Sequence, residues 1–161
     1  RNRIINSGNE ELRQEFDFVS KATCPIASAR EEVFKDLLKA ENRVNESWVL
    51  NALRLLNSDV FEPQSNVYLV EGLKALPEIQ KTNSLAFPGR WTRTLISNHR
   101  SAEAKTEIQK FLAESTDYPA NLKNYVYESA WVLMNQVPYV DKTPKPEPTT
   151  TTKKKTTKKK K

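Results

Sequence analysis

The stretch "SLAFPGRWTRTLISNHRSAEA", residues 84–104, contains one helix, the start of a second and the joint between them. Pro88 suits the first turn of a helix whose apolar stripe contains Trp91. Ser101 is typical of the N-cap of the helix that follows. His99 lies between the two, where we expect its side chain to satisfy the carbonyls that end the first helix. The stretch therefore predicts two consecutive helices joined by a short turn.

Helical periodicity continues on both sides of this stretch. Apolar residues recur three or four positions apart, and no segment alternates with the period of two that a strand requires. We expect helices over residues 7–23, 28–38, 45–56, 65–82 with a bend or restart at Pro77, 88–96, 101–112 and 119–134. Short connections between helices of this length predict an all-α protein, an α-α superhelix of about seven helices in stacked antiparallel pairs.

Several helix starts carry capping signals. Ser7 with Glu10, and Ser28 with Glu31, have the S-x-x-E spacing of a capping box. Asn45 is a further candidate N-cap. The carboxylates of both boxes then lie in first helical turns, where they complement the helix dipole. This position favours a structural role for them over acid–base catalysis.

The apolar stripes also predict which side chains form the core. In the first helix, Leu12, Phe16 and Val19 are spaced i, i+4, i+7, as on one face of a helix. Each tryptophan falls on a helical stripe with aliphatic neighbours, which favours core packing over stacking on a base or ligand. These three residues are Trp48, Trp91 and Trp131.

The basic charge of the chain is confined to its last residues. The formal net charge is +6, but residues 141–161 alone carry nine Lys against two acidic residues, so residues 1–140 have a net charge of −1. A helical-repeat domain over 1–140 therefore has no basic groove for sequence-specific nucleic-acid binding. Residues 141–161 contain no large apolar residue and predict a disordered tail. We expect this tail to attract polyanions non-specifically, and a merely solvating or anchoring tail is the alternative.

Residues for catalysis and metal binding are scarce. His99 and Cys24 are the single His and the single Cys of the chain, so neither an H-E-x-x-H zinc site nor an internal disulfide can form. Cys24 is expected to be a small half-buried side chain at a helix end rather than a nucleophile. No apolar run approaches the roughly 20 residues of a membrane-spanning helix. Neither catalysis nor a membrane span is expected of this chain.

The order of several short motifs adds a resemblance. The segments "ESWVLNALRLLN", "VYLVEGLKALPEIQKTNSLAFPGRWTRTLISNHRSAEAKTEIQKFL" and "YPANLKNYVYESAWVL" together resemble the C-terminal helical domain of bacterial M1-family zinc aminopeptidases, over roughly residues 10–135. The matching positions are Trp48 through Leu53 for W-x-x-x-A-L, Leu73 through Gln80 for L-x-x-L-x-E-I-Q, Phe87, Pro88 and Trp91 for F-F-P-x-x-W, His99, Ser101, Glu103 and Ala104 for H-x-S-x-E-A, and Tyr118, Pro119 and Leu122 for Y-P-x-x-L.

The resemblance implies a non-catalytic domain that covers the active site and bounds a chamber for peptide substrates. The family's zinc-binding and catalytic residues belong to an upstream domain, so zinc is expected there and no cofactor in this chain. The start at Arg1, without Met or a signal-like segment, suggests a piece of a longer polypeptide. The expected partners are the catalytic domain of the same polypeptide and the peptide substrate.

Three arginines are candidates for binding that substrate. Arg54, Arg90 and Arg93 each lie beside a helical apolar stripe or a helix start, from which they could face the chamber and attract the terminal carboxylate of a peptide. The alternative is that all three are solvated surface residues. The alternative function is a free-standing helical-repeat scaffold that binds a protein partner and carries a polyanion-binding Lys tail.

Overall fold

The computed structural model describes residues 8–62 and 64–135, and the predicted tail over 141–161 lies outside them. Within the described residues the chain forms eight α-helices, several of them joined by short 3-10 turns, and no strand. The helices are α2 (Glu10–Ser20), α3 (Ala27–Leu37), α4 (Glu46–Leu56), α5 (Val67–Lys74), α6 (Leu76–Thr82), α7 (Phe87–Ile96), α8 (Ala102–Glu114) and α9 (Ala120–Met134). The predicted all-α class is confirmed.

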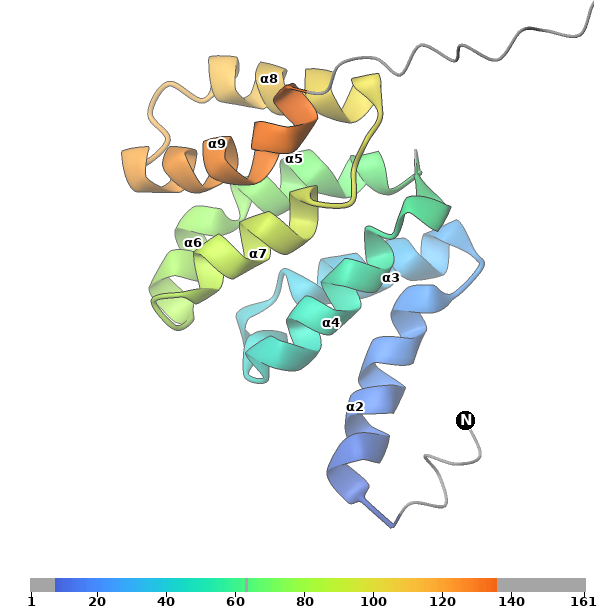
Figure 1. Ribbon diagram of the computed structural model, residues 1–161. Coiled ribbons are helices and arrows are strands. Elements are labelled where there is room, and N and C mark those ends of the chain that lie inside the picture. Colours follow the sequence, from blue (N-terminus) through green and yellow to red (C-terminus); the bar gives the residue numbers. More distant parts are fainter. Residues whose placement is uncertain (1–7, 63, 136–161) are drawn as a thin grey trace, which may run out of the picture.

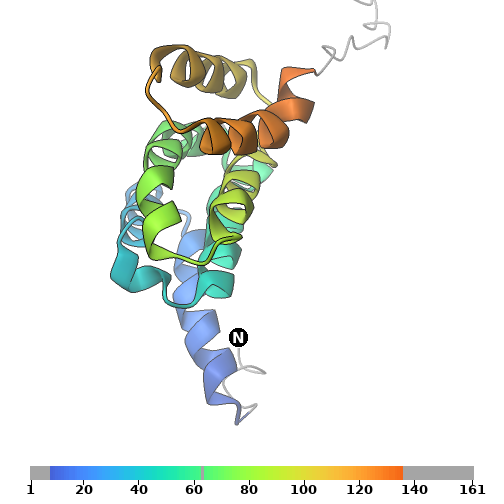
Figure 2. The same cartoon turned by 90° about the vertical axis from the view of Figure 1, so that its left-hand side faces the viewer.

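The helices stack as antiparallel pairs in two layers (Figure 1; Figure 2). Helix α3 packs on α4, α5 and α6 pack on α7, and α8 packs on α9. One layer contains α4, α7 and α9, and the other contains α3, α5 and α8. Helix α2 contacts α4 and projects from the end of the stack opposite to α8 and α9 (Figure 1). The predicted α-α superhelix of stacked pairs is therefore confirmed.

Helix α7 is the centre of the stack, because it contacts α4, α5, α6 and α9. Its Trp91 is fully buried, and the indole Nε1 donates a hydrogen bond to the carbonyl oxygen of Gly72 at 3.1 Å. A Cβ atom at Gly72 would lie 2.7 Å from a methyl carbon of Leu95. A larger residue at position 72 would therefore displace the side chain of Leu95, which is buried in the contact between α5 and α7.

The segment expected over residues 65–82 forms two helices. Helix α5 ends at Lys74, and α6 begins at Leu76 with Pro77 in its first turn. Proline has no backbone N–H and cannot continue the hydrogen-bond ladder of the preceding helix. The chain therefore restarts at this point, which gives eight helices where about seven were expected.

The capping box expected at Ser28 and Glu31 does not form. Helix α3 begins directly after Ile26, whose side chain has no acceptor, and Ser28 already lies inside the helix. Glu31 and Glu32 consequently lie beyond the first turn, contrary to expectation. The carboxylate of Glu31 instead pairs with the ammonium of Lys35 one turn later, at 2.7 Å.

Other predicted caps have mixed outcomes. Ser101 caps α8 as expected, because its hydroxyl accepts the backbone N–H of Ala104 at 3.2 Å. Asn45 occupies the N-cap position of α4, but its side chain makes no capping hydrogen bond. Helix α2 is capped by the side chain of Asn9, and the predicted cap Ser7 lies outside the described residues.

The three tryptophans do not share one environment. Trp91 is buried, and Trp48 is half-buried with its ring centroid 6.2 Å from that of Phe18. Trp131 is 68% exposed, so its predicted place in the core is wrong. The buried stripe of α9 consists of Leu122, Val126, Ala130 and Leu133. Trp131 follows Ala130 in sequence, and a step of one residue on a helix turns the side chain away from that stripe.

A buried arginine lies in the turn between α3 and α4, the first helix pair. Arg43 closes the 3-10 turn Ala40–Arg43, and its side chain has no exposed surface. Its Nη1 donates to the carbonyl oxygens of Leu37, at 3.3 Å, and of Leu38. These carbonyls lie at the C-terminal end of α3, where a helix leaves acceptors without partners. The guanidinium therefore caps α3 from within the protein.

The same guanidinium reaches the second helix pair. Nε of Arg43 donates to Oδ1 of Asn83 at 2.9 Å. Nη2 donates to the carboxylate of Glu78 at 2.5 Å and to the hydroxyl of Thr82 at 3.0 Å. Because Glu78 and Thr82 belong to α6 and Asn83 follows it, one side chain connects the end of α3 to α6.

This network predicts that Arg43→Met destabilises the protein by about 2–4 kcal/mol, because it leaves buried carbonyl and amide acceptors without donors. The measurement is the free energy of unfolding from urea titrations. Arg93→Met is the matched control, since Arg93 is exposed and should change stability by less than about 0.5 kcal/mol. Equal losses in the two variants would show that the Arg43 network does not stabilise the fold.

Candidate functional site

Helices α4 and α7 lie side by side and run in the same direction. At their starts, the carboxylate of Glu46 accepts the backbone N–H of Ser84 at 2.7 Å and its hydroxyl at 2.6 Å. At their ends, Oδ1 of Asn57 lies 2.9 Å from Nε2 of His99. The N-terminal ends of α4 and α7 therefore lie together, and so do their C-terminal ends. The solvent-facing residues of the two helices consequently form one surface.

All three candidate arginines are exposed on this surface. Arg54 lies in α4, and Arg90 and Arg93 lie in α7. Because α7 is enclosed by four other helices, the exposed positions of its second and later turns form a narrow stripe that includes both of its arginines. The structure thus places the three candidates on neighbouring parallel helices of one layer.

Two of the arginines already have polar neighbours. The Arg54 guanidinium donates to Oδ1 of Asn51, whose amide donates to Oε1 of Glu15 in α2 at 2.9 Å. Arg90 lies near Glu46 and helps to lower the pKa of that carboxyl. Arg93 forms no ion pair with any residue in 8–62 or 64–135. Arg93 is therefore the candidate with the least competition for an incoming carboxylate.

Glu46 holds its charge although it is partly screened from water. Burial by itself raises the pKa of this carboxyl, but the hydrogen bonds from the hydroxyl and backbone N–H of Ser84 and from Asn83, together with the charge of Arg90, outweigh it. The net pKa is below the usual value of Glu. The arginine-bearing surface therefore has an ionised carboxylate at its edge.

His99 is buried in a polar cluster and is 1% exposed. Its Nε2 lies 2.9 Å from Oδ1 of Asn57, whose amide nitrogen donates to the carbonyl of Leu53 at 2.9 Å. Its Nδ1 lies 2.9 Å from Oδ1 of Asn66 and 3.8 Å from Glu62. The expected position at a helix joint is correct. The ring joins two side-chain amides, and it also has a hydrogen bond with the backbone of Leu95 in the last turn of α7, which acts to raise its pKa.

The surroundings of His99 set its charge. Burial is the largest influence and lowers the pKa of the imidazole, and it outweighs the attraction of Glu62. The nearby positive charge of Arg100 lowers it further. A neutral ring enclosed by amides, with no reacting group beside it, is suited to fastening α4, α7 and the turn before α5 together.

Glu62 organises the turn that follows His99. Its Oε1 accepts the backbone N–H groups of Arg100, at 2.9 Å, and Ser101, at 2.8 Å. Partial burial acts to raise the pKa of Glu62, but these hydrogen bonds outweigh it and the pKa lies below its ordinary value. The carboxylate thereby fixes the joint between α7 and α8.

No set of metal ligands or membrane-spanning element occurs within the described part of the chain. No three His, Cys, Asp or Glu side chains there are arranged to hold a metal ion. Cys24 is half-buried, as expected. The backbone carbonyl oxygen of Cys24 accepts a hydrogen bond from Arg30 at 2.6 Å. None of the helices α2–α9 is long and apolar enough to cross a membrane.

An apolar groove lies beside α2. No residue of α2 is buried, so its apolar stripe of Leu12, Phe16 and Val19 is not part of the core. These residues line a hollow of about 410 Å³ together with Glu15, Ser20, Thr23 and Leu55. The sequence stripe was correct as a helical pattern, but α2 has a neighbour on one side only. We call this hollow the α2 groove.

Comparison of the chain with models of known protein families, with curated protein sequences and with solved structures gives no match. The assignment of function therefore depends on the residues and surfaces described above.

The buried neutral His99 predicts a pH dependence of stability. Because its pKa is lower in the folded state than the usual 6.5, the unfolded state binds the proton more readily. The stabilisation should be complete above pH 6.5 and decrease as the pH falls through the folded-state pKa. Urea titrations from pH 7.5 to 5 measure this decrease.

In His99→Gln the decrease over that range should be much smaller, since this is the single His of the chain. Glu46 and Glu62 contribute in a separate range, because their lowered pKa values lie under 4.5. An equal loss of stability in wild type and variant between pH 7.5 and 5 would contradict a buried neutral imidazole.

Proposed function

We propose that this chain is the non-catalytic C-terminal helical domain of a zinc metallo-aminopeptidase, where it bounds the chamber that receives peptide substrates. The zinc and the catalytic residues then belong to a separate domain of the same polypeptide. The observation that carries the proposal is the α2 groove, an apolar face at one end of a stack whose other helices are paired.

The α2 groove supports a continuing stack. In this architecture each helix of the α4 layer has a partner in the other layer, and α2 packs on α4 without one. Leu12 is 39% exposed, and Phe16 and Val19 are half-buried on the same face. Covering such a face removes apolar surface from water and stabilises the contact. A further helical or catalytic unit of one polypeptide fits this requirement.

The residues that carry the family resemblance have coherent structural roles. Trp91 donates to the carbonyl of Gly72, and the hydroxyl of Tyr118 donates to the carbonyl of Leu73 at 2.5 Å. Ser101 caps α8 and His99 fastens the α7–α8 joint. These residues hold successive helix pairs together, so a protein with the same fold would need them in the same order along its sequence. This supports a resemblance in fold.

The exposed arginines support the chamber role. A peptide's terminal carboxylate is a planar anion that one guanidinium binds with two parallel hydrogen bonds. Arg93 has no competing ion pair, and Arg54 and Arg90 lie on the same layer. The α4–α7 surface is therefore the one that we assign to the substrate side.

Docking at the α2 groove is testable with two separate pieces of the parent enzyme. We expect the upstream part, expressed alone, to bind this chain, and Phe16→Ser to weaken binding about 10- to 100-fold because burial of a phenylalanine is lost. Isothermal titration calorimetry measures the affinity. Leu85→Ser is the control, since Leu85 is 90% exposed elsewhere. Absence of binding by the wild-type chain would favour a free-standing scaffold.

Carboxylate capture is testable in the full parent enzyme. Arg→Ala at the residue that faces the chamber should raise KM about 5- to 100-fold for a tripeptide with a free carboxylate. The same tripeptide with an amidated C-terminus is the control, because it offers no anion. Arg54, Arg90 and Arg93 are compared separately. Equal effects on both peptides at all three positions would show that none of the three arginines binds the terminal carboxylate.

A further inference from the structure

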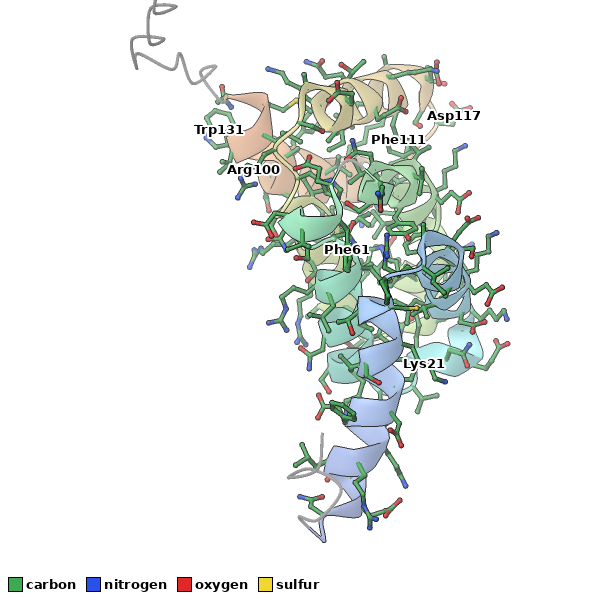
Figure 3. All side chains as sticks on the ribbon, turned by 90° about the vertical axis from the view of Figure 1, so that its right-hand side faces the viewer. Lys21, Phe61, Arg100, Phe111, Asp117 and Trp131 are labelled. Carbon is green, nitrogen blue, oxygen red and sulfur yellow. The ribbon has the colours of Figure 1, made fainter. Side chains whose placement is uncertain are left out.

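A second groove runs between α5 and α8, in the layer opposite to the candidate arginines. Two adjoining hollows of about 510 and 350 Å³ share Val70, Lys74 and Glu107 as lining residues. Phe111 lies between the two helices and forms part of the lining (Figure 3). The hollows together extend from the first turn of α5 to the last turn of α8. We call them the α5/α8 groove.

The α5/α8 groove has an excess of negative charge. Its lining includes four carboxylates and two ammonium groups: Glu71, Glu103, Glu107 and Glu114 against Lys74 and Lys110. None of these six groups forms an ion pair within the described ranges. Valine and phenylalanine side chains form the apolar part. A positively charged ligand with alkyl stems matches this lining, since lysine stems pack on apolar surface while their ammonium groups meet carboxylates.

The chain itself contains such a ligand, and the described residues that precede it end beside α8. Residues 141–161 carry nine Lys and a net charge of +7. The described part ends just after α9, where the ammonium of Lys105 in α8 donates to the carbonyl oxygen of Met134 at 2.8 Å. Glu103 and Glu107 flank Lys105 in α8. The end of α9 is therefore beside the helix that supplies half of the groove.

The connecting length is sufficient. Lys142, the first lysine of the segment, is seven residue steps along the chain from Asn135. Extended chain spans up to about 3.3–3.6 Å per residue, so this connection reaches roughly 23–25 Å. A helix with its side chains is about 10–12 Å across. The lysines can consequently pass around α8 and enter the groove from the end of α9.

We propose that the α5/α8 groove is the docking site of the chain's own lysine-rich segment, residues 141–161. Covalent attachment favours this occupant over a separate basic peptide, because a tether gives an effective concentration of about millimolar. The contact is electrostatic and weakens with salt. Docking engages the lysines with carboxylates of the same molecule, so a polyanion has to compete with the groove to bind them.

A paramagnetic label tests the contact in the full chain. Cys24→Ala leaves Thr151→Cys as the single thiol for a nitroxide, and it preserves the Arg30 hydrogen bond, which uses the Cys24 carbonyl. We expect enhanced relaxation of the backbone amides of Glu71, Glu103 and Glu107 at 50 mM NaCl, and its loss at 500 mM. The amides of Glu10, Glu11 and Asp17, which lie on α2, should be unaffected.

Charge-neutral variants give the specificity control. Each exposed charge pair corresponds to about a 1.4- to 5-fold change in an equilibrium constant, so Glu71→Gln, Glu103→Gln and Glu107→Gln combined should weaken docking by about 3- to 100-fold. Glu10→Gln, Glu11→Gln and Asp17→Asn remove the same charge on α2 and should leave the relaxation pattern unchanged. Equal loss in both triple variants would overturn the proposal.

Mixed samples separate docking within one chain from docking between copies. Isotope-labelled protein without the nitroxide is combined with unlabelled protein that carries it. We expect no enhanced relaxation in this mixture. Enhancement there equal to that in the singly labelled chain would show that the segment docks on a second copy, and an enhancement spread evenly over all acidic surfaces would show that the groove is not its site.

Discussion

Burying a positive charge constrains this fold more tightly than any single apolar contact. The Arg43 guanidinium has no exposed surface, and removing a cation from water is costly unless acceptors surround it. Its acceptors come from the end of α3, from α6 and from Asn83. These groups can meet only if the first two helix pairs are stacked in one register. The spacing of the pairs is therefore fixed by a polar requirement inside an apolar core.

Arg30 applies the same rule at another joint. It is 2% exposed, donates to the Cys24 carbonyl and to Gln64 at 2.8 Å, and lies 4.0 Å over the ring of Phe61. His99 follows the pattern with Asn57 and Asn66. Each of these side chains connects segments more than thirty residues apart in sequence. Apolar stripes bring helices together, and these polar groups determine how the helices are aligned.

Local sequence patterns predicted the parts of the fold that depend on local interactions. Ser101 caps α8 and Pro88 opens α7, because capping and proline geometry act within one turn. Trp131 was placed in the core because its neighbours are aliphatic, but its exposure depends on which side of α9 faces α7 and α8. A single amphipathic stripe does not distinguish a helix packed on both sides from one packed on a single side.

In the candidate site, too, local features could be predicted from the sequence and long-range features could not. The sequence placed Arg54, Arg90 and Arg93 beside an apolar stripe or a helix start, and the structure has all three exposed on two neighbouring parallel helices. Burial of Arg30 and Arg43 could not be predicted, because each has acceptors more than thirty residues away in sequence, Gln64 for Arg30 and Glu78, Thr82 and Asn83 for Arg43. The α2 groove also depends on the absence of a second neighbour among the described helices, which periodicity does not report. Long-range partners, rather than local propensity, decide these features.

The exposure of helix α2 affects the local unfolding of the protein. None of its residues is buried, so detaching it from α4 exposes little apolar surface and costs less free energy than opening any inner pair. Backbone amides of α2 can exchange their hydrogens through this partial opening while the Trp91 core remains closed. The stack therefore has a graded stability along its length, lowest at the end formed by α2.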